Sequence, residues 1–443
     1  MPFDSSGEVP YCELRTLVLK VRSGATPRGG AGAYISKRLN FALVRSQNVF
    51  DYRFEPSGLA YITDAQAREL AGAELEPNDV LLNITGDGVT FGRSCLVPSS
   101  VLPACVNQHV MLIRANPEKC VAGYLAAWLA LPETKAYIES FNAGGSRRAI
   151  TKGHIEAFML PLPPLEIQRE IAAFVVAIND RIDILRQTSA TLESIAQALF
   201  KSWFIDFDPV RAKAEGREPE GMDAATAALF PDEFDESALG LIPKGWRVRS
   251  LDSFASYLNG LALQKYPPES DDEFLPVIKI AQLRAGNTVG ADRASARLKS
   301  EYVAKDGDVL FSWSGSLEVE FWCGGDGALN QHLFKVTSNE VPKWFYYMAT
   351  RHFLPGFREI AAHKATTMGH IQRKHLTEAM LALPEAAVIR ELGLVVGPLM
   401  ERRIANALQG RELARLRDTL LPRLISGKLR LPEAQAQLEE ALS

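Results

Sequence analysis

One stretch of the sequence, residues 161–208, constrains the fold more than any other. It reads PLPPLEIQREIAAFVVAINDRIDILRQTSATLESIAQALFKSWFIDFD, and its apolar residues step by threes and fours, with one position missing near Thr188. This pattern is typical of a coiled-coil helix. Because proline is tolerated only in the first helical turn, we expect the helix to run from about Leu165 to Phe204, roughly 60 Å. A helix this long cannot leave its apolar seam in water, so it requires a partner helix.

The same chain contains that partner. Residues 383–429 read LPEAAVIRELGLVVGPLMERRIANALQGRELARLRDTLLPRLISGKL, and Pro384, Arg390 and Glu391 lie 221 positions after Pro163, Arg169 and Glu170. Interior glycines and Pro398 weaken this copy, so we expect a kink near Pro398. We predict an antiparallel pair of helices whose seam contains Ile171, Phe174, Ile178, Ile182, Leu185, Leu192, Ile195, Leu199, Leu392, Leu399, Leu416 and Leu420.

The repeat extends upstream of the helices. Residues 43–49 resemble 277–283, residues 78–81 resemble 307–310, residues 146–163 match 367–384, and the tripeptide Asn107-Gln108-His109 recurs as Asn330-Gln331-His332. A whole module is therefore duplicated, in the order module, helix, module, helix. Residues 1–160 read as short strands with loops and a few helices. The fold class we predict is α+β, with two mixed α/β domains in a tandem pseudo-repeat and two long helices that form an antiparallel coiled coil.

Composition adds little to this architecture. The chain has 443 residues, 47% of them apolar and 23% charged, which is ordinary for a globular protein. No apolar run is long enough to span a bilayer, and the five cysteines form no C-x-x-C pair, so we expect a cytoplasmic protein with free thiols. Residues 206–245 hold ten acids, four bases and many prolines and glycines, and we expect an extended acidic linker there. The net charge of -4 therefore says little about any one face of the molecule.

The sequence also contains four distinctive motifs: LPPLEIQREI, ALFKSWFIDFDPVRAKAEG, GLIPKGW and LLPRLISGKL. With these motifs and the repeat, the chain resembles the specificity (S) subunit of a type I DNA restriction-modification system over nearly its full length. The resemblance implies target-recognition domains at 1–160 and 246–384, spacer helices at 161–205 and 385–430, the linker at 206–245 and a tail at 431–443. It also implies that each domain reads one half of a split site in double-stranded DNA. The helices would bind two methyltransferase subunits, and restriction subunits would join that complex.

Basic polar loops precede both long helices, at residues 142–152 and 363–370. Arginine suits bidentate contact with guanine, and lysine suits contact with phosphate. An isolated basic pair is more often a solvated surface, but the recurrence at the same place in both modules favours a surface that faces DNA. The candidates for DNA contact in and after these loops are Ser146, Arg147, Arg148, Thr151, Lys152, Lys364, Thr366, Thr367 and Arg373.

The shared tripeptide allows two interpretations. Asparagine and glutamine pair well with adenine, which makes Gln108 and Gln331 further candidates for DNA contact. However, a residue shared by modules that read different sequences cannot explain the difference between them. A structural role, such as satisfying buried backbone groups, is the preferred interpretation of the tripeptide.

Catalytic motifs are missing from the sequence. It has no G-x-x-x-x-G-K-[ST] and no G-x-S-x-G, and the spacing of His352, His363, His370 and His375 fits no compact metal motif. We therefore predict a non-catalytic recognition subunit without cofactor or metal. Two alternatives are a nuclease built on Glu133, Lys135 and a further acid, which would cut DNA without partners, and a coiled-coil adaptor that binds no nucleic acid.

Overall fold

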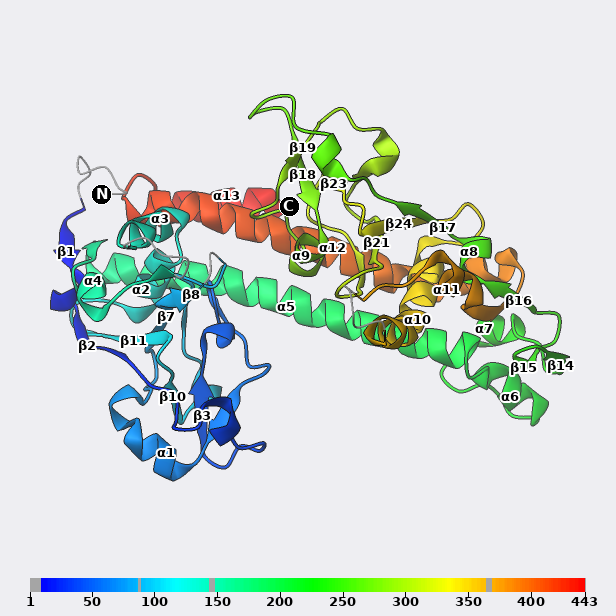
Figure 1. The fold of residues 1–443 in the computed structure, drawn as a ribbon, viewed down its shortest axis with the longest axis horizontal. Helices are drawn as coiled ribbons and strands as arrows, with labels where there is room; N and C mark the ends of the chain where they lie inside the picture. The colour runs from blue at the N-terminus through cyan, green and yellow to red at the C-terminus, as the bar shows by residue number, and fades with distance from the viewer. Residues whose placement is uncertain (1–8, 87–88, 143–147, 364–368, 443) are drawn as a thin grey trace. The chain divides into compact units, whose positions relative to one another are not determined.

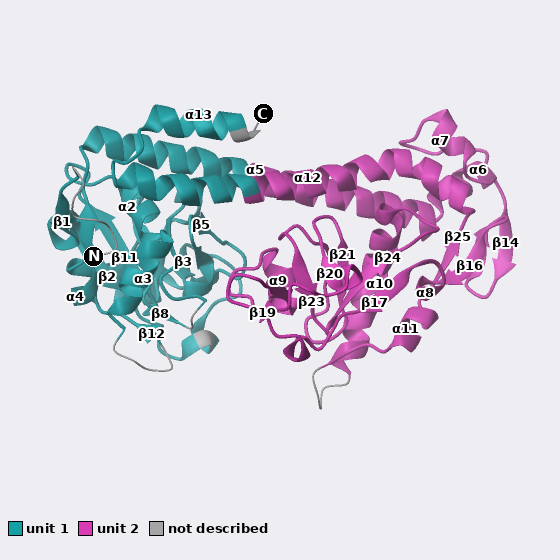
Figure 2. Ribbon diagram, turned by 90° about the horizontal axis from the view of Figure 1, so that it is seen from above, with its two compact units in different colours: residues 1–183, 412–443 teal, residues 184–411 magenta. Residues whose placement is uncertain are grey.

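The computed structural model describes residues 9–86, 89–142, 148–363 and 369–442. The chain divides into two compact units, one formed by residues 1–183 and 412–443 and the other by residues 184–411 (Figure 2). Both long helices, α5 (Leu165–Phe204) and α12 (Ala386–Ile425), contribute to both units (Figure 1). The bounds of α5 are those predicted from the proline positions and the apolar spacing.

Unit 1 is built around a four-stranded antiparallel sheet in the order β2-β11-β7-β9. A second sheet has the order β10-β3-β6, in which β10 and β3 are parallel. Helices α2 and α3 follow β11, and the short strands β1 and β13 pair with each other. The strands and helices named here are β1 (Tyr11–Glu13), β2 (Val18–Ser23), β3 (Phe41–Val44), β6 (Ala60–Ile62), β7 (Val80–Asn83), β9 (Ser94–Leu96), β10 (Ala104–Val106), β11 (Val110–Ala115), β13 (Met159–Pro161), α2 (Ala122–Leu129) and α3 (Pro132–Ser140).

Unit 2 repeats the main features of this plan. Its main sheet has the order β17-β24-β21-β22, the parallel pair is β18 and β23, and β16 pairs with β25. The long helix α10 takes the place of α2 and α3. The elements are β16 (Arg247–Ser250), β17 (Ser256–Asn259), β18 (Leu275–Ile278), β21 (Val309–Ser312), β22 (Val319–Phe321), β23 (Gly327–Leu329), β24 (Leu333–Thr337), β25 (Met380–Leu383) and α10 (Lys343–Ala362). The duplication of a mixed α/β module is confirmed in the fold.

The two long helices run antiparallel in each unit. In unit 1 the Arg417 guanidinium donates to Asn179 Oδ1 at 2.6 Å, and in unit 2 Asn406 Nδ2 donates to Ser189 Oγ at 3.3 Å. Most predicted seam residues are buried, with relative exposures of 8% or less at Ile171, Phe174, Ile178, Ile182, Leu185, Leu392, Leu416 and Leu420. Leu192, Leu199 and Leu399 are half-buried. Helix α12 continues through Pro398 and its glycines without interruption.

Ile195 departs from the predicted seam. Its side chain is 45% exposed, while Glu193 and Ala196 beside it are buried. In unit 2 helix α5 packs against α10 as well as α12, and Phe200 of α5 contacts Phe345 of α10 with ring centroids 5.6 Å apart. A helix with 3.6 residues per turn also drifts against a strict seven-residue repeat. The buried face has therefore turned toward Ala196 and Phe200.

The acidic segment 206–245 is folded, so the expectation of an extended linker was wrong. It forms α6 (Asp208–Ala214), α7 (Ala224–Ala228) and the hairpin β14 (Phe234–Ser237) and β15 (Gly240–Pro243). Phe207, Phe230 and Trp246 are buried together with Trp203 in the core of unit 2. These large apolar residues outweigh the charge and the prolines that suggested an open chain. The tail is also ordered, as helix α13 (Leu431–Leu442) in unit 1.

Candidate nucleic-acid interface

The shared tripeptide forms a turn that leads into β11 in unit 1. Asn107 is buried, and its Oδ1 accepts from the backbone N–H of His109 at 3.0 Å. The His109 ring lies with Nδ1 2.6 Å from Oγ1 of Thr85. This contact joins the turn to β8 (Thr85–Gly86), the short strand that follows β7. Gln108 is exposed at the tip and accepts from the Thr26 hydroxyl.

The same frame recurs in unit 2. Asn330 is buried, and its Oδ1 accepts from the N–H of His332 at 3.2 Å. His332 Nδ1 lies 2.9 Å from Oγ of Ser314, the counterpart of Thr85. Gln331 is half-buried, with Nε2 3.4 Å from Nε2 of His332. The asparagines and histidines of the tripeptide thus hold the same turn in both units.

The C-terminal ends of both basic loops, which the structure describes, contact the turn formed by the shared tripeptide and its neighbours. In unit 1, Arg148 and Ala149 form the short strand β12, which pairs with Gly86 and Thr85 of β8. In unit 2, Ser314 and His370 form the corresponding bridge, and the Gly315 N–H donates to the Gly369 carbonyl at 2.8 Å. The basic loop, the tripeptide turn and the segment that follows β7 or β21 therefore converge at one place in each module. We call that segment, Thr85–Gly86 in unit 1 and Ser314-Gly315 in unit 2, the β8-type turn.

The predicted DNA-contact residues have different surroundings. Arg148 forms an ion pair with Glu139 at 2.6 Å, and Lys152 lies 3.4 Å from Glu156. Thr151 is the N-cap residue of α4 (Lys152–Glu156). The described residues exclude Ser146, Arg147, Lys364, Thr366 and Thr367.

Arg373 lies farther along the sheet of unit 2. Its Nη2 donates to the Tyr257 carbonyl at 3.2 Å, and its guanidinium lies over the Phe334 ring at 5.6 Å. The convergence thus includes Gln108, Arg148 and Gln331 but not Lys152 or Arg373. Arg148, like Lys152 and Arg373, is engaged by a neighbouring group.

Asn259 and Trp313 lie at the unit 2 convergence and were not among the predicted contacts. Trp313 Nε1 donates to Asn259 Oδ1 at 2.9 Å, and the Trp313 ring contacts His370 edge-on with centroids 6.3 Å apart. The ring centroids of His332 and Trp313 are 5.8 Å apart, with the ring planes tilted by 40°. The sequence marks these positions only when the two modules are aligned strand by strand, because they are places where the modules differ.

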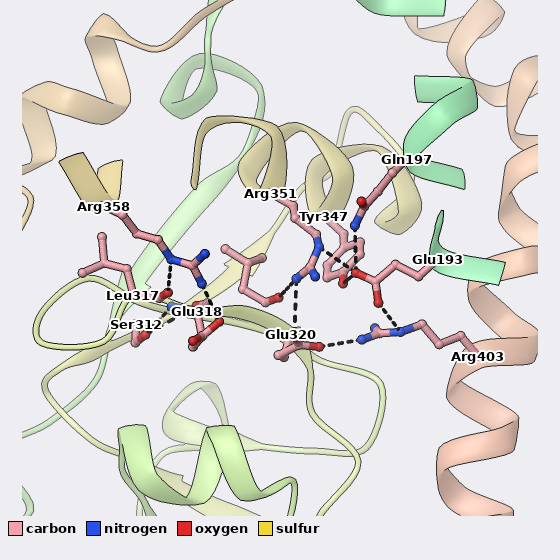
Figure 3. A network of polar contacts seen from close by, with 11 residues as sticks. Glu193, Gln197, Ser312, Leu317, Glu318, Glu320, Tyr347, Arg351, Arg358 and Arg403 are labelled. Atoms are coloured by element: carbon pink, nitrogen blue, oxygen red, sulfur yellow. Dashed lines mark hydrogen bonds and ion pairs between the residues drawn. The ribbon is translucent and has the colours of Figure 1, made fainter. Parts of the chain in front are cut away.

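A partly buried ring of ion pairs attaches the unit 2 module to the long helices (Figure 3). Glu193 of α5 accepts from Arg351 Nε of α10 at 2.6 Å and from Arg403 Nε of α12 at 3.0 Å. Glu320 of β22 accepts from Arg403 Nη2 at 2.5 Å and from Arg351 Nη1 at 3.2 Å. The Tyr347 hydroxyl donates to Glu193 Oε1 at 3.0 Å. Two carboxylates balance two guanidinium groups, so the ring carries no net charge.

The guanidinium groups also stack on aromatic rings. Arg403 lies over Phe321 at 5.4 Å and over Tyr347 at 5.5 Å, and these two rings are stacked with centroids 4.1 Å apart. Desolvation acts to lower the pKa of Arg403, but Tyr347, Glu320 and Glu193 outweigh it and raise the pKa, so the arginine stays charged. In unit 1 another α12 arginine, Arg417, lies over the Tyr52 ring at 3.9 Å.

Lys135 pairs with Asp51, and no group of three or more His, Cys, Asp or Glu residues could hold a metal ion in the part of the chain that is described. His375 is buried as part of the capping box of α11 (Arg373–Glu378), and His363 follows the end of α10. Among the described residues, no helix is both long and apolar enough to cross a membrane.

Comparison with known proteins finds type I restriction-modification specificity subunits. Residues 72–194 match the family model of the type I restriction modification DNA specificity domain. The chain is 23% identical to the HindI type I restriction enzyme specificity subunit of Haemophilus influenzae, over 90% of this chain and 98% of that one. It is 25% identical to the MjaIX specificity subunit of Methanocaldococcus jannaschii, over 94% and 92%. A crystal structure of an S subunit from M. genitalium covers 96% of this chain and 98% of its own, with 12% identity and a TM-score of 0.49.

Proposed function

Since the chain belongs to the family of type I restriction-modification specificity subunits, we propose that each of its two modules reads one half of a bipartite target in double-stranded DNA. The observation that carries this proposal is the frame found twice. The tripeptide turn, the β8-type turn and the end of the basic loop meet in the same register in both units. Side chains on this shared frame differ, which is what two readers of different half-sites require.

The long helices suit the role of spacer. Forty residues at 1.5 Å per residue give roughly 60 Å, and half-sites on one face of a duplex recur about every 34 Å. A spacer of this length matches half-sites one to two helical turns apart. The recognition modules at 1–160 and 246–384 would then act at the two ends of one target.

The helices would also bind two methyltransferase subunits, and restriction subunits would act through that complex. Apolar side chains on α5 support a protein-docking role, because Ile167, Val176, Ile184 and Ile195 are each at least 40% exposed. Exposed apolar side chains mark a protein interface where they form a contiguous patch. In this proposal the chain contributes recognition and assembly, and the partner subunits contribute the chemistry.

The test is to co-express the chain with its methyltransferase partner in a host that lacks DNA methylation and to map the methylated bases. A split motif with methylation in both halves is the expected result. A contiguous motif, or methylation without sequence preference, would contradict the proposal of two readers. A complex that binds no DNA would favour the adaptor alternative, and cutting of DNA by the purified chain with magnesium would favour the nuclease.

A further inference from the structure

The two modules can be compared position by position because their sheets share one register. In unit 1, Ser23 at the end of β2 pairs with Met111, and in unit 2, Asn259 at the end of β17 pairs with Phe334. The two partners, Met111 and Phe334, each lie two residues after the histidine of the shared tripeptide. The residue after each strand is a glycine, Gly24 or Gly260, at which an added Cβ would lie within 2.4 Å of a backbone carbonyl oxygen.

Two further pairs of positions follow in the same way. Ile84 directly follows β7, and Trp313 directly follows β21, the equivalent strand of unit 2. The residue after each, Thr85 or Ser314, pairs with Ala149 in unit 1 and with His370 in unit 2. Unit 1 thus has serine, isoleucine and alanine at the three places where unit 2 has Asn259, Trp313 and His370. Because the strand register matches at these positions, the side chains there can account for a difference in recognition.

The orientation of the Asn259 amide is fixed by its partner. The indole N–H of Trp313 can only donate, so the Asn259 atom 2.9 Å from it is the oxygen. The NH₂ group therefore points away from Trp313. Asn259 is half-buried, its Nδ2 is not among the buried polar atoms that lack a partner, and it donates to none of the described residues. A preoriented, accessible donor is the result.

Resting on the proposed function, we infer that Asn259, held by Trp313, is a specificity-determining residue of the second module. Its NH₂ group donates to a hydrogen-bond acceptor on a base edge, of the kind that purine N7, guanine O6 and thymine O4 provide in the major groove. Trp313 is a positioning residue, since it fixes which end of the amide faces outward. Unit 1 has Ile84 in place of the indole and cannot orient Ser23 in this way.

Asn259→Asp is the decisive variant. The carboxylate still accepts from Trp313 Nε1, but the donor is replaced by an acceptor. The full complex with its methyltransferase subunits is incubated with a pool of randomised duplexes, and the bound sequences are read. We expect a preference at one base pair of one half-site to fall about tenfold, with the other half-site unchanged. Asn259→Ser, which places the unit 1 residue there without adding charge, should change the same base pair.

The matched control is Asn339→Asp, which adds the same charge on the same module. Asn339 is exposed and follows β24 at the Ser256–Thr337 end of its ladder with β17, whereas Asn259 is at the other end. This variant should select the wild-type motif. An added charge alone weakens binding to all sequences alike, because it acts on the phosphates.

Two outcomes overturn the inference. If the wild-type complex selects a two-part motif and both Asn259 variants select it unchanged or with uniformly weaker binding, Asn259 reads no base and the inference alone fails. If the wild-type complex selects no two-part motif, the proposed function fails and the inference fails with it.

Discussion

At the scale of single residues, Glu193 of α5 links its helix to both α10 and α12. It accepts hydrogen bonds or ion pairs from Tyr347, Arg351 and Arg403 and from Gln197 Nε2 at 3.1 Å. Removing its charge leaves two half-buried guanidinium groups with only Glu320 to balance them. We expect Glu193→Gln to lower the free energy of unfolding of unit 2 by about 3 kcal/mol, measured by urea denaturation.

Glu340→Gln is the control for that loss. Glu340 pairs with Arg249 in the same unit, but the two side chains are 44% and 30% exposed. Solvent screens such a pair, so its loss should cost less than about 1 kcal/mol. Equal losses in the two variants would show that the ion-pair ring contributes nothing beyond an ordinary surface ion pair.

Asp306 offers a prediction about pH. Desolvation acts to raise its pKa, but hydrogen bonds from Arg411, with N–O distances of 2.7 and 2.8 Å, and from the Gly325 N–H outweigh it and lower the pKa. A lowered pKa in the folded state means that the stabilisation is present above the ordinary pKa of about 3.9 and is lost as the pH falls through the lowered value.

The variant Asp306→Asn tests this assignment. We expect it to be less stable than the wild type by about 1 kcal/mol at pH 6, since the pair is partly exposed. The difference between the two unfolding free energies should shrink as the pH approaches 2. A difference that stays constant over this range would mean that the Asp306 charge is not the source of the stabilisation.

At the scale of elements, two glycines of α12 separate packing from helix propensity. A Cβ at Gly393 would lie 2.7 Å from Nε1 of the buried Trp344, whereas a Cβ at Gly410 would meet nothing within 4 Å. Alanine is better than glycine in a helix by about 1 kcal/mol. Gly410→Ala should therefore raise the melting temperature, and Gly393→Ala should lower it because Trp344 must move. A rise in both variants would contradict the close packing of Trp344 on α12.

Much of the element structure could be predicted from periodicity and proline positions. Helix α5 is an example, because Pro163 and Pro164 mark its start and its apolar residues repeat over forty positions. Ile195 could not be assigned, because a seven-residue pattern describes a helix with one partner and this part of α5 has two. The segment 206–245 was misjudged because composition hides the contribution of a few large side chains such as Phe207 and Phe230.

The candidate interface was predictable only in outline. The structural role preferred for the tripeptide agrees with the hydrogen bonds of Asn107 and Asn330, which could be inferred because both modules share them. Basic residues were the obvious candidates for DNA contact, but sequence cannot show that Arg148 has Glu139 as a neighbour. Asn259 has no signal in the sequence alone, since its orientation depends on Trp313, 54 residues later.

At the scale of the whole molecule, independence of the modules is the main prediction. Replacing residues 1–160 with the equivalent region of a relative should change one half-site and leave the other intact, as mapped by methylation of a plasmid library. A change of both half-sites would mean that the modules do not read separately. The exchange removes Tyr52, so the incoming module should carry a tyrosine at that position to keep the contact with Arg417 of α12.

The spacer makes a second prediction at this scale. Inserting four residues in α5 near Thr188 adds roughly 6 Å of helix and displaces the Ser189–Asn406 and Glu193–Arg403 contacts. We expect either a changed distance between otherwise unaltered half-sites or a loss of assembly, read from the methylated motif and from size-exclusion chromatography. An unchanged spacing in an assembled complex would contradict the spacer role of the helices.

The folded acidic segment decides where the chain can be divided for laboratory use. Trp246 contacts Phe207 and Phe230 with ring centroids 5.8 and 6.5 Å apart, and Phe230 also contacts Trp203 at 5.8 Å. A fragment that begins at residue 246 would leave Trp246, Trp344 and their neighbours open to water, and bacterial expression of such a fragment should give insoluble material. A cassette for transplanting the second reader therefore has to begin inside α5, well before the acidic segment, and to carry that segment with it.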